Sequence, residues 1–301
     1  MRSPRVFASI LVLISTLGFG LRDDQLPSPK ATRSEAHVVR WEPDRIVNGS
    51  PCLFRVRPSV PLKSLTGTWM GHEVFFDFDP ARRTWFGLAG VSIETNPGSY
   101  PLVLEGVTSK GLQTTIRQTV RVFRTKYPTI ALRVLEEFTA PDSRTLARVE
   151  QEKELKTKLF SVLSPEREWS GRFTVPVSSS VSGAFGTQRK FNGLIESVHH
   201  GLDYRAQPGT PVSAANRGTV LLARDLFFEG NCVVLDHGQG LLTFYMHLSE
   251  IKVHEGDKVA RGQEIGLSGA TGRATGPHVH MAVRWQGIYV NPVVMLELNL
   301  P

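Results

Sequence analysis

The chain has only two cysteines among its 301 residues, too few for a disulfide framework or a metal site built from cysteines alone. Neither Cys52 nor Cys232 has neighbours typical of a metal ligand or a catalytic nucleophile. Cys232 falls in the apolar run Asn231–Leu235, which predicts a buried strand where a free cysteine packs as a small hydrophobe. A bond between the two cysteines is the alternative in an oxidising compartment.

The N-terminal apolar run Val6–Leu21 is shorter than the roughly 20 residues that a bilayer-spanning helix needs. It follows Arg2 and Arg5 and ends near Gly18-Phe19-Gly20, a pattern typical of a secretory signal peptide. We therefore predict that residues 1–21 are a signal peptide or an uncleaved membrane anchor. The expected location is the periplasm, the cell envelope or the extracellular space, and such an anchor is the one membrane contact that we expect.

The sequence also lacks a stripe of interleaved aromatic and arginine residues, so we do not expect it to bind nucleic acid. Its 35 lysines and arginines exceed its 28 acidic residues and give a net charge of +7, which favours anionic polymers, including acidic cell-wall polymers. The hydrophobic fraction of 41% and the charged fraction of 21% are ordinary for a globular protein. We expect a monomer.

A chain of this length can hold two domains, and the patterning predicts a mostly β fold. Short strand candidates such as Val74–Phe78, each stopped by turn residues, predict an immunoglobulin-like β-sandwich over residues 46–125. Within residues 116–122, apolar side chains at Ile116, Val120 and Val122 share one face of a predicted strand. Residues 22–45, rich in Pro, Ser and Lys toward their start, are predicted to be a flexible spacer.

A connector is predicted over residues 126–168, containing a strand at Thr129–Val134 and an amphipathic helix over residues 144–163. An imperfect apolar stripe on that helix, from Leu146 to Val162, predicts packing on one or both domains. Residues 169–301 are again β-like and rich in glycine, and we expect an antiparallel β-sheet or small barrel-like domain. This C-terminal block carries the chemistry.

Seven of the nine histidines lie between residues 199 and 280. Residues two apart on a strand point to the same face, so His278 and His280 can enter one site, as can His199 and Asp203 on either side of Gly201. Zinc takes histidine nitrogen and carboxylate oxygen, and a catalytic zinc site keeps one position open for water. The pattern predicts a metal-dependent hydrolase, whereas the helical motif H-E-x-x-H of thermolysin-like enzymes is absent.

The C-terminal block carries ordered motifs that together resemble the M23 zinc metallopeptidases of the lysostaphin and LytM type. The motifs are Ser182-Gly183-Ala184-Phe185-Gly186-Thr187-Gln188-Arg189, then His199-x-Gly201-x-Asp203, Tyr245-Met246-His247-Leu248-Ser249 and Gly276-Pro277-His278-Val279-His280. Pairs of histidines recur by chance, but several ordered motifs with matching glycine and proline punctuation do not.

The resemblance implies a role for each matching residue. It implies that His199, Asp203 and His280 bind one Zn²⁺ per chain and that His247 and His278 are catalytic residues that do not bind the metal. We favour His278 as the general base and His247 as the electrostatic or proton-shuttling partner, and the reverse assignment stays open. The implied reaction is endopeptidase cleavage of peptidoglycan cross-links or stem peptides during cell-wall remodelling or lysis.

Side chains near these motifs are candidates for binding the peptidoglycan peptide: Arg189, Asn192, Tyr204 and Tyr245. Alternatively, the two tyrosines only form walls, and Arg189 serves a local carboxylate. A further alternative concerns the whole domain, because some M23-like proteins lack ligands and act as binding regulators of other cell-wall hydrolases. All five metal and catalytic positions are intact here, which favours catalysis.

Overall fold

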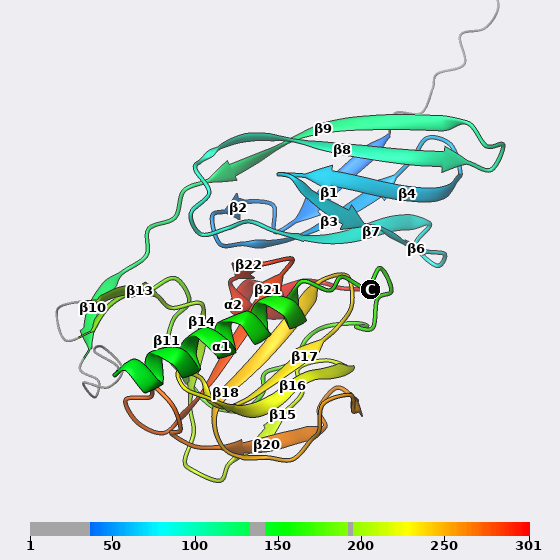
Figure 1. The fold of residues 1–301 in the computed structure, drawn as a ribbon. Coiled ribbons are helices and arrows are strands. Elements are labelled where there is room, and N and C mark those ends of the chain that lie inside the picture. The colour runs from blue at the N-terminus through cyan, green and yellow to red at the C-terminus, as the bar shows by residue number, and fades with distance from the viewer. Residues whose placement is uncertain (1–36, 133–141, 192–194) are drawn as a thin grey trace, which may run out of the picture. The chain divides into compact units, whose positions relative to one another are not determined.

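The computed structural model describes residues 37–132, 142–191 and 195–301 (Figure 1). Strands make up about half of these residues and helices about a tenth, so the prediction of a mostly β fold is confirmed. The predicted signal peptide or anchor at residues 1–21 lies outside the described residues. Within the described part of the chain, no helix has the length and apolar character needed to cross a membrane.

The N-terminal region consists of two sheets whose inner faces meet. Phe54 of β3 and Trp69 of β4 come from different sheets, and their ring centroids lie 5.0 Å apart in an edge-to-face arrangement. One sheet has the order β1 (Val38–Glu42), β3 (Pro51–Arg57), β7 (Thr84–Gly90) and β6 (Asp77–Asp79). The other has the order β2 (Ile46–Val47), β9 (Gln113–Phe123), β8 (Gly98–Thr108), β4 (Leu62–Trp69) and β5 (His72–Phe75). The immunoglobulin-like character of this region remains a prediction.

Two boundaries in this region differ from the sequence prediction. The predicted flexible spacer over 22–45 is wrong at its end, because β1 pairs along its full length with β3 and buries part of Val39 and Trp41. The single strand expected at Val74–Phe78 is two strands that belong to different sheets, with the chain crossing between them at Phe76. The alternation within β9 is confirmed, since Ile116, Val120 and Val122 are all buried.

The connector holds one short strand and one long helix, as predicted. Strand β10 (Thr129–Leu132) pairs in parallel with β12 (Gln188–Phe191), which in turn pairs with β13 (Ile195–Val198). Helix α1 (Ser143–Phe160) begins after Asp142, whose side chain accepts a hydrogen bond from the Thr145 amide at 2.8 Å and so caps the first turn. The connector is therefore continuous with the C-terminal β structure.

Helix α1 packs on the C-terminal sheet through its C-terminal half. Leu155, Leu159 and Phe160 pack against a cluster contributed by β16 (Gly218–Leu226), β17 (Gly230–Asp236), β18 (Leu241–Ile251) and β21 (His278–Trp285). In Figure 1 the helix lies across this sheet. The predicted apolar stripe is correct only in this half, because Leu146 is 54% exposed and Val162, beyond the helix end, is 71% exposed. The N-terminal half is held by charged side chains instead.

The C-terminal region is one sheet of ten strands in which every pair is antiparallel, as predicted. Its main path runs β11 (Val181–Gly183), β14 (Gly201–Arg205), β21 (His278–Trp285), β18 (Leu241–Ile251), β17 (Gly230–Asp236), β16 (Gly218–Leu226) and β19 (Lys258–Val259). Joined to it are β15 (Pro211–Ser213), β20 (Glu264–Ser268) and β22 (Ile288–Val290), and α2 (Pro292–Glu297) follows. A barrel-like closure of this sheet remains a prediction.

Both cysteines are buried and free in this fold. Cys232 lies on β17, where the sequence predicts a buried strand, and Cys52 lies on β3. Burial raises the pKa of each thiol well above its ordinary value. The cysteines therefore act as small apolar core residues, as the sequence indicates.

Candidate active site

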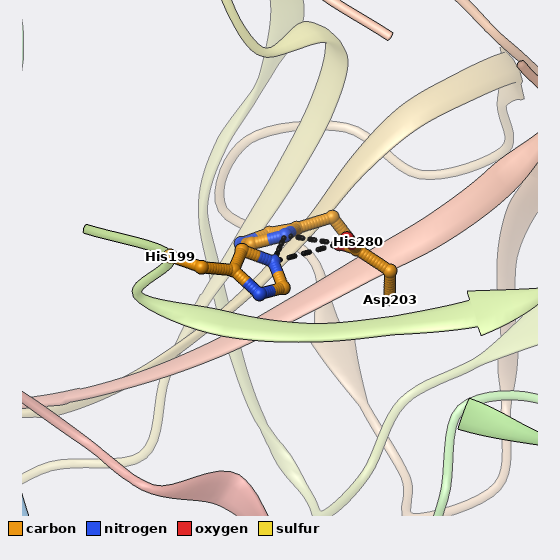
Figure 2. A group of neighbouring side chains, drawn as sticks. All are labelled: His199, Asp203 and His280. Carbon is orange, nitrogen blue, oxygen red and sulfur yellow. Dashed lines mark hydrogen bonds and ion pairs between the residues drawn. The ribbon is translucent and has the colours of Figure 1, made fainter. Parts of the chain in front are cut away.

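The site forms where two antiparallel strands, β14 and β21, bring distant residues into register. Asp203 on β14 lies opposite His280 on β21. His199 is in the two-residue connection between β13 and β14, so it is not on a strand with Asp203 as the sequence suggested. The chain turn nevertheless directs it into the same site, and the three side chains point toward one another in Figure 2. All three residues are buried.

The three side chains converge on one point with atoms that bind metals well. Nε2 of His199 lies 2.8 Å from Oδ1 of Asp203 and 3.0 Å from Nδ1 of His280. Nδ1 of His280 lies 2.8 Å from the same carboxylate oxygen. The other nitrogen of His199, Nδ1, is 2.8 Å from the Ala184 carbonyl oxygen and donates to it in the neutral ring, so that Nε2 carries a lone pair.

Such crowding of lone pairs is unfavourable unless a proton or a cation lies between them. Two histidine nitrogens and one carboxylate oxygen are the donor set of many catalytic zinc sites, in which the fourth position is left open. The Ala184 carbonyl fixes the ring orientation of His199 as an outer partner of a metal ligand does. His199, Asp203 and His280 therefore fit a divalent metal ion.

Electrostatics favour the protonation states that metal binding requires. Burial raises the pKa of Asp203, but the adjacent His199 and His280 side chains outweigh this effect and hold that pKa well below its ordinary value. Burial lowers the pKa of His280 to about 4, against the opposing effect of its hydrogen bond with Asp203. At neutral pH the site thus holds an ionised carboxylate and a neutral His280, both ready to donate lone pairs.

His278 is the first residue of β21 and lies on the same face of the strand as His280, as predicted. Its Nδ1 is 2.8 Å from the Gly276 carbonyl oxygen, to which the neutral ring donates. Its Nε2 is 3.7 Å from Oδ1 of Asp203 and so faces the cluster. This nitrogen is in a position to accept a proton from a molecule bound at the site.

His247 reaches the site because β18 carries a bulge. Tyr245 pairs with Val233 and Leu248 with Asn231, so two residues of β18 lie opposite one residue of β17. His247 sits in this bulge with a φ of 63°, in the left-handed region that a residue with a side chain rarely adopts. The bulge turns its ring to within 4.7 Å of the His278 ring and 6.2 Å of the His280 ring, measured between centroids.

The environment keeps His247 neutral. Burial, together with charge repulsion from His278 and His280, lowers the pKa of His247 to about 3. Its Nδ1 lies 2.8 Å from the Thr271 carbonyl oxygen and donates to it, which leaves Nε2 as the nitrogen available to accept a hydrogen bond. The structure thus brings together all five histidine and aspartate residues that the sequence singles out.

These five residues line one cleft of about 510 Å³. Its wall includes Phe228 and Glu229 between β16 and β17, Arg273 in the loop before β21, and Ile130 and Leu132 of β10. The sequence does not identify the β10 residues as cleft residues, because they are ordinary apolar residues more than sixty positions before His199. Only the parallel pairing of β10 with β12 places them at the cleft.

The four predicted substrate contacts have different outcomes. Tyr204 and Tyr245 are buried in the core, 2% and 0% exposed, so the structure does not support contact of either one with substrate. The Tyr245 hydroxyl instead accepts a hydrogen bond from the Ala215 amide at 2.7 Å. Asn192 lies outside the described residues. Arg189 lines the cleft, but its Nη2 donates to Oδ2 of Asp203 at 2.5 Å, which agrees with the alternative that it serves a local carboxylate.

Comparison with known proteins agrees with this geometry. Residues 197–292 match the sequence profile of Peptidase family M23. The chain is 46% identical over 103 residues to peptidoglycan DD-endopeptidase ShyA of Vibrio cholerae, covering 34% of this chain and 23% of that protein. It is 44% identical over 96 residues to the DD-carboxypeptidase/endopeptidase Mpg of Neisseria meningitidis, covering 32% and 22%. The matches thus span about a quarter of these relatives.

A solved structure of a peptidase M23 from Pseudomonas aeruginosa resembles a larger part of the chain. It has a TM-score of 0.64 and 29% identity, and the match covers 84% of this chain and 95% of that one. The structural similarity to this protein therefore extends beyond residues 197–292, which match the family profile. On its ordered motifs, its site and these matches, the chain contains a peptidase family M23 domain over residues 197–292.

Proposed function

We propose that the protein is a zinc-dependent endopeptidase that hydrolyses peptide bonds in peptidoglycan cross-links or stem peptides. The observation that carries the proposal is the convergence of His199, Asp203 and His280 within 3.0 Å of one another, beside two further histidines. Three ligands and two catalytic groups are the components that hydrolysis of an amide requires. The peptidoglycan substrate is supported by the activities named for the relatives in Vibrio and Neisseria.

A bound zinc ion supplies Lewis acidity and makes a water molecule acidic enough to attack a carbonyl carbon near neutral pH. His199, Asp203 and His280 would hold the ion, and Arg189 donates to the second oxygen of Asp203. His278 accepts the proton of the attacking water at Nε2, because Nδ1 is committed to the Gly276 carbonyl. His247 assists at its own Nε2 as the proton-shuttling or electrostatic partner, and exchange of these two roles is the alternative.

The burial of the site supports catalysis over passive binding. Each of the three proposed ligands is less than a tenth exposed, and Nδ1 of both His247 and His278 donates to a backbone carbonyl. These hydrogen bonds fix the two rings before substrate arrives, and such preorganisation is what an active site needs. A regulator that had lost catalysis would have no need to retain both rings.

Export and a monomeric state belong to the same proposal. Peptidoglycan lies outside the cytoplasm, and the charged start and apolar run of residues 1–21 support delivery to it. Fractionation of cells that produce the protein, with N-terminal sequencing of the exported form, tests both export and cleavage. Recovery of the full chain in the cytoplasm alone contradicts the proposed location.

The activity is tested by digestion of purified peptidoglycan with the zinc-loaded protein. Sacculi with different cross-links are used, and mass spectrometry identifies the released muropeptides. We expect new termini at one type of peptide bond and no cleavage by His278→Ala. If the zinc-loaded protein releases nothing but increases the activity of a partner hydrolase, the protein is a regulator and the enzymatic proposal is wrong.

A further inference from the structure

We propose that helix α1 is part of the active-site framework and that its Lys156 is a positioning residue for His247. The helix precedes residues 197–292, which match the family profile, so this contribution comes from the connector. The inference rests on the proposed function only in taking His247 to act in hydrolysis. The structural link from helix to histidine stands on contacts alone.

The link runs through residues 227–229, the turn between β16 and β17, which we call the cleft turn. Phe228 and Glu229 of this turn line the cleft. The Glu229 carbonyl oxygen accepts a hydrogen bond from the backbone amide of His247 at 2.9 Å. The Phe228 carbonyl oxygen accepts one from the Arg273 amide, also at 2.9 Å. The cleft turn therefore supports two segments of the site through its backbone.

These two segments are themselves joined at His247. Arg273 belongs to the loop that contains Thr271, and the Thr271 carbonyl oxygen is the partner of His247 Nδ1. The Thr271 hydroxyl accepts a hydrogen bond from the Asn231 amide at 2.9 Å, just beyond the cleft turn. A displacement of the turn would consequently reach both the backbone and the ring of His247.

Helix α1 holds the cleft turn with one row of side chains. Both oxygens of Glu152 accept hydrogen bonds from the Phe227 amide, at 3.1 and 2.9 Å. One turn of helix later, Lys156 Nζ forms an ion pair with Glu229 Oε1 at 2.6 Å. One turn earlier, Arg148 pairs with Asp225 at 2.8 Å. Residues four apart lie on the same helix face, so a single face makes all three contacts.

The pair of Lys156 and Glu229 is the contact nearest to His247. The two side chains are only 25% and 16% exposed. The other carboxylate oxygen of Glu229, Oε2, is buried and has no hydrogen-bond partner among the described residues. Removal of one member of a partly buried ion pair leaves the other charge without that partner, and that charge moves toward water. Without Lys156, Glu229 would draw the cleft turn away from its present position.

His247 is sensitive to such a movement because its backbone is strained. A φ of 63° in a residue with a side chain persists only where surrounding contacts enforce it. The Glu229 carbonyl supplies one of those contacts. When it moves, the bulge can relax and the imidazole leaves its place beside His278.

Lys156→Met tests this link, with Lys153→Met as the matched control. Lys153 pairs with Glu150 on the same helix at 3.0 Å, but its side chain is 69% exposed and contacts no cleft residue in the described structure. Two quantities are measured on zinc-loaded full chains: kcat and KM for peptidoglycan peptide hydrolysis, and hydrogen exchange of the His247 amide by NMR. Zinc affinity is measured alongside.

For Lys156→Met we expect kcat to fall about 10- to 100-fold with little change in KM, since a small misplacement of a catalytic group has effects of that size. The His247 amide should exchange faster, and zinc affinity should stay unchanged because the ligands do not contact the cleft turn. Lys156→Arg should restore most of kcat, and Lys153→Met should match the unsubstituted protein.

The exchange measurement separates this inference from the proposed function, because it needs no activity. Unchanged protection of the His247 amide in Lys156→Met overturns the inference, whatever happens to turnover. Faster exchange with unchanged kcat overturns it as well, since His247 would then be displaced without consequence. If Lys156→Met does not fold, Lys156→Gln is subjected to the same two measurements and the same criteria.

Discussion

Asp203 and His280 face each other across the antiparallel pair β14 and β21, with Asp203 Oδ1 2.8 Å from His280 Nδ1. The second oxygen of Asp203 is held by Arg189 from β12, a strand of a different sheet. The carboxylate is therefore fixed on one side by an arginine and directed on the other at the proposed metal position.

His280→Ala should abolish stoichiometric zinc binding, whereas His278→Ala should keep the metal and lose turnover. The difference arises because His280 offers a ligand atom to the cluster, while His278 Nε2 lies 3.7 Å from Asp203 Oδ1. Zinc content by mass spectrometry and hydrolysis rates measure the two effects. His254→Ala, at a side chain 93% exposed, is the control that should change neither. Full zinc occupancy in His280→Ala would overturn the ligand assignment.

Arg189→Met should weaken zinc binding about 10- to 100-fold, the range found when an outer partner of a ligand is lost. The reason is that Asp203 Oδ2 loses its charged donor and the carboxylate is no longer oriented. Chelator competition measures the affinity, and Arg205→Met, exposed on β14, is the control. Unchanged zinc affinity with a raised KM would instead support the sequence prediction that Arg189 binds substrate.

Gly201→Ala should destabilise the protein by about 1–3 kcal/mol and weaken zinc binding, because a small-to-large change in a packed site forces neighbours to move. A Cβ at residue 201 would collide with the Met281 carbonyl oxygen and would lie 2.6 Å from His280 Nε2. Urea denaturation and zinc titration measure the two effects. Gly98→Ala on β8, where a Cβ would meet only Tyr100 at 3.5 Å, should be close to neutral. Equal effects of both substitutions would contradict this explanation.

His237 should make folding stability dependent on pH between 6.5 and 4. Burial lowers its pKa from 6.5 to about 4, and the ring lies 2.7 Å from the Arg217 carbonyl and 2.8 Å from the Thr243 hydroxyl. The unfolded chain takes up a proton below pH 6.5, but the folded chain does so only below about 4. The contribution of neutral His237 to the free energy of unfolding is therefore fully present above pH 6.5. It decreases by about 3 kcal/mol as the pH falls to 4.

The measurement is urea denaturation at several pH values, with His237→Gln and His254→Gln compared in parallel. His237→Gln should be less stable at neutral pH, and its free energy of unfolding should not show the decrease between pH 6.5 and 4 that we assign to His237. His254→Gln should retain it. If the two variants show the same slope between pH 6.5 and 4, the buried histidine does not account for the loss.

Several features could be predicted from sequence because they depend on local spacing. His278 and His280 share a strand face whatever that strand pairs with, and Asp142 caps α1 through an amide three residues away. The alternating strand at β9 and the buried strand around Cys232 are local patterns of the same kind. The ligand and catalytic residues themselves were proposed from motifs that keep their order in the chain.

Other features escaped prediction because their cause lies elsewhere in the chain. An aromatic residue beside a motif can line a groove or fill the core, and only the packing of β14 and β18 put Tyr204 and Tyr245 inside. The start of the sandwich at β1 depended on a partner strand, and the cleft residues of β10 depended on parallel pairing with β12.

By itself the sequence indicated which residues can do chemistry here, because spacing puts His278 and His280 on one strand face and the ordered motifs carry the resemblance that implies the ligand set. Tertiary structure alone decided how those residues are held. Three features show this: the bulge that turns His247 into the site, the salt bridge of Arg189 with Asp203, and the row of α1 side chains at the cleft turn. Each joins residues from separate elements of the fold. Such contacts follow from strand register and packing across the whole chain, which no local pattern specifies.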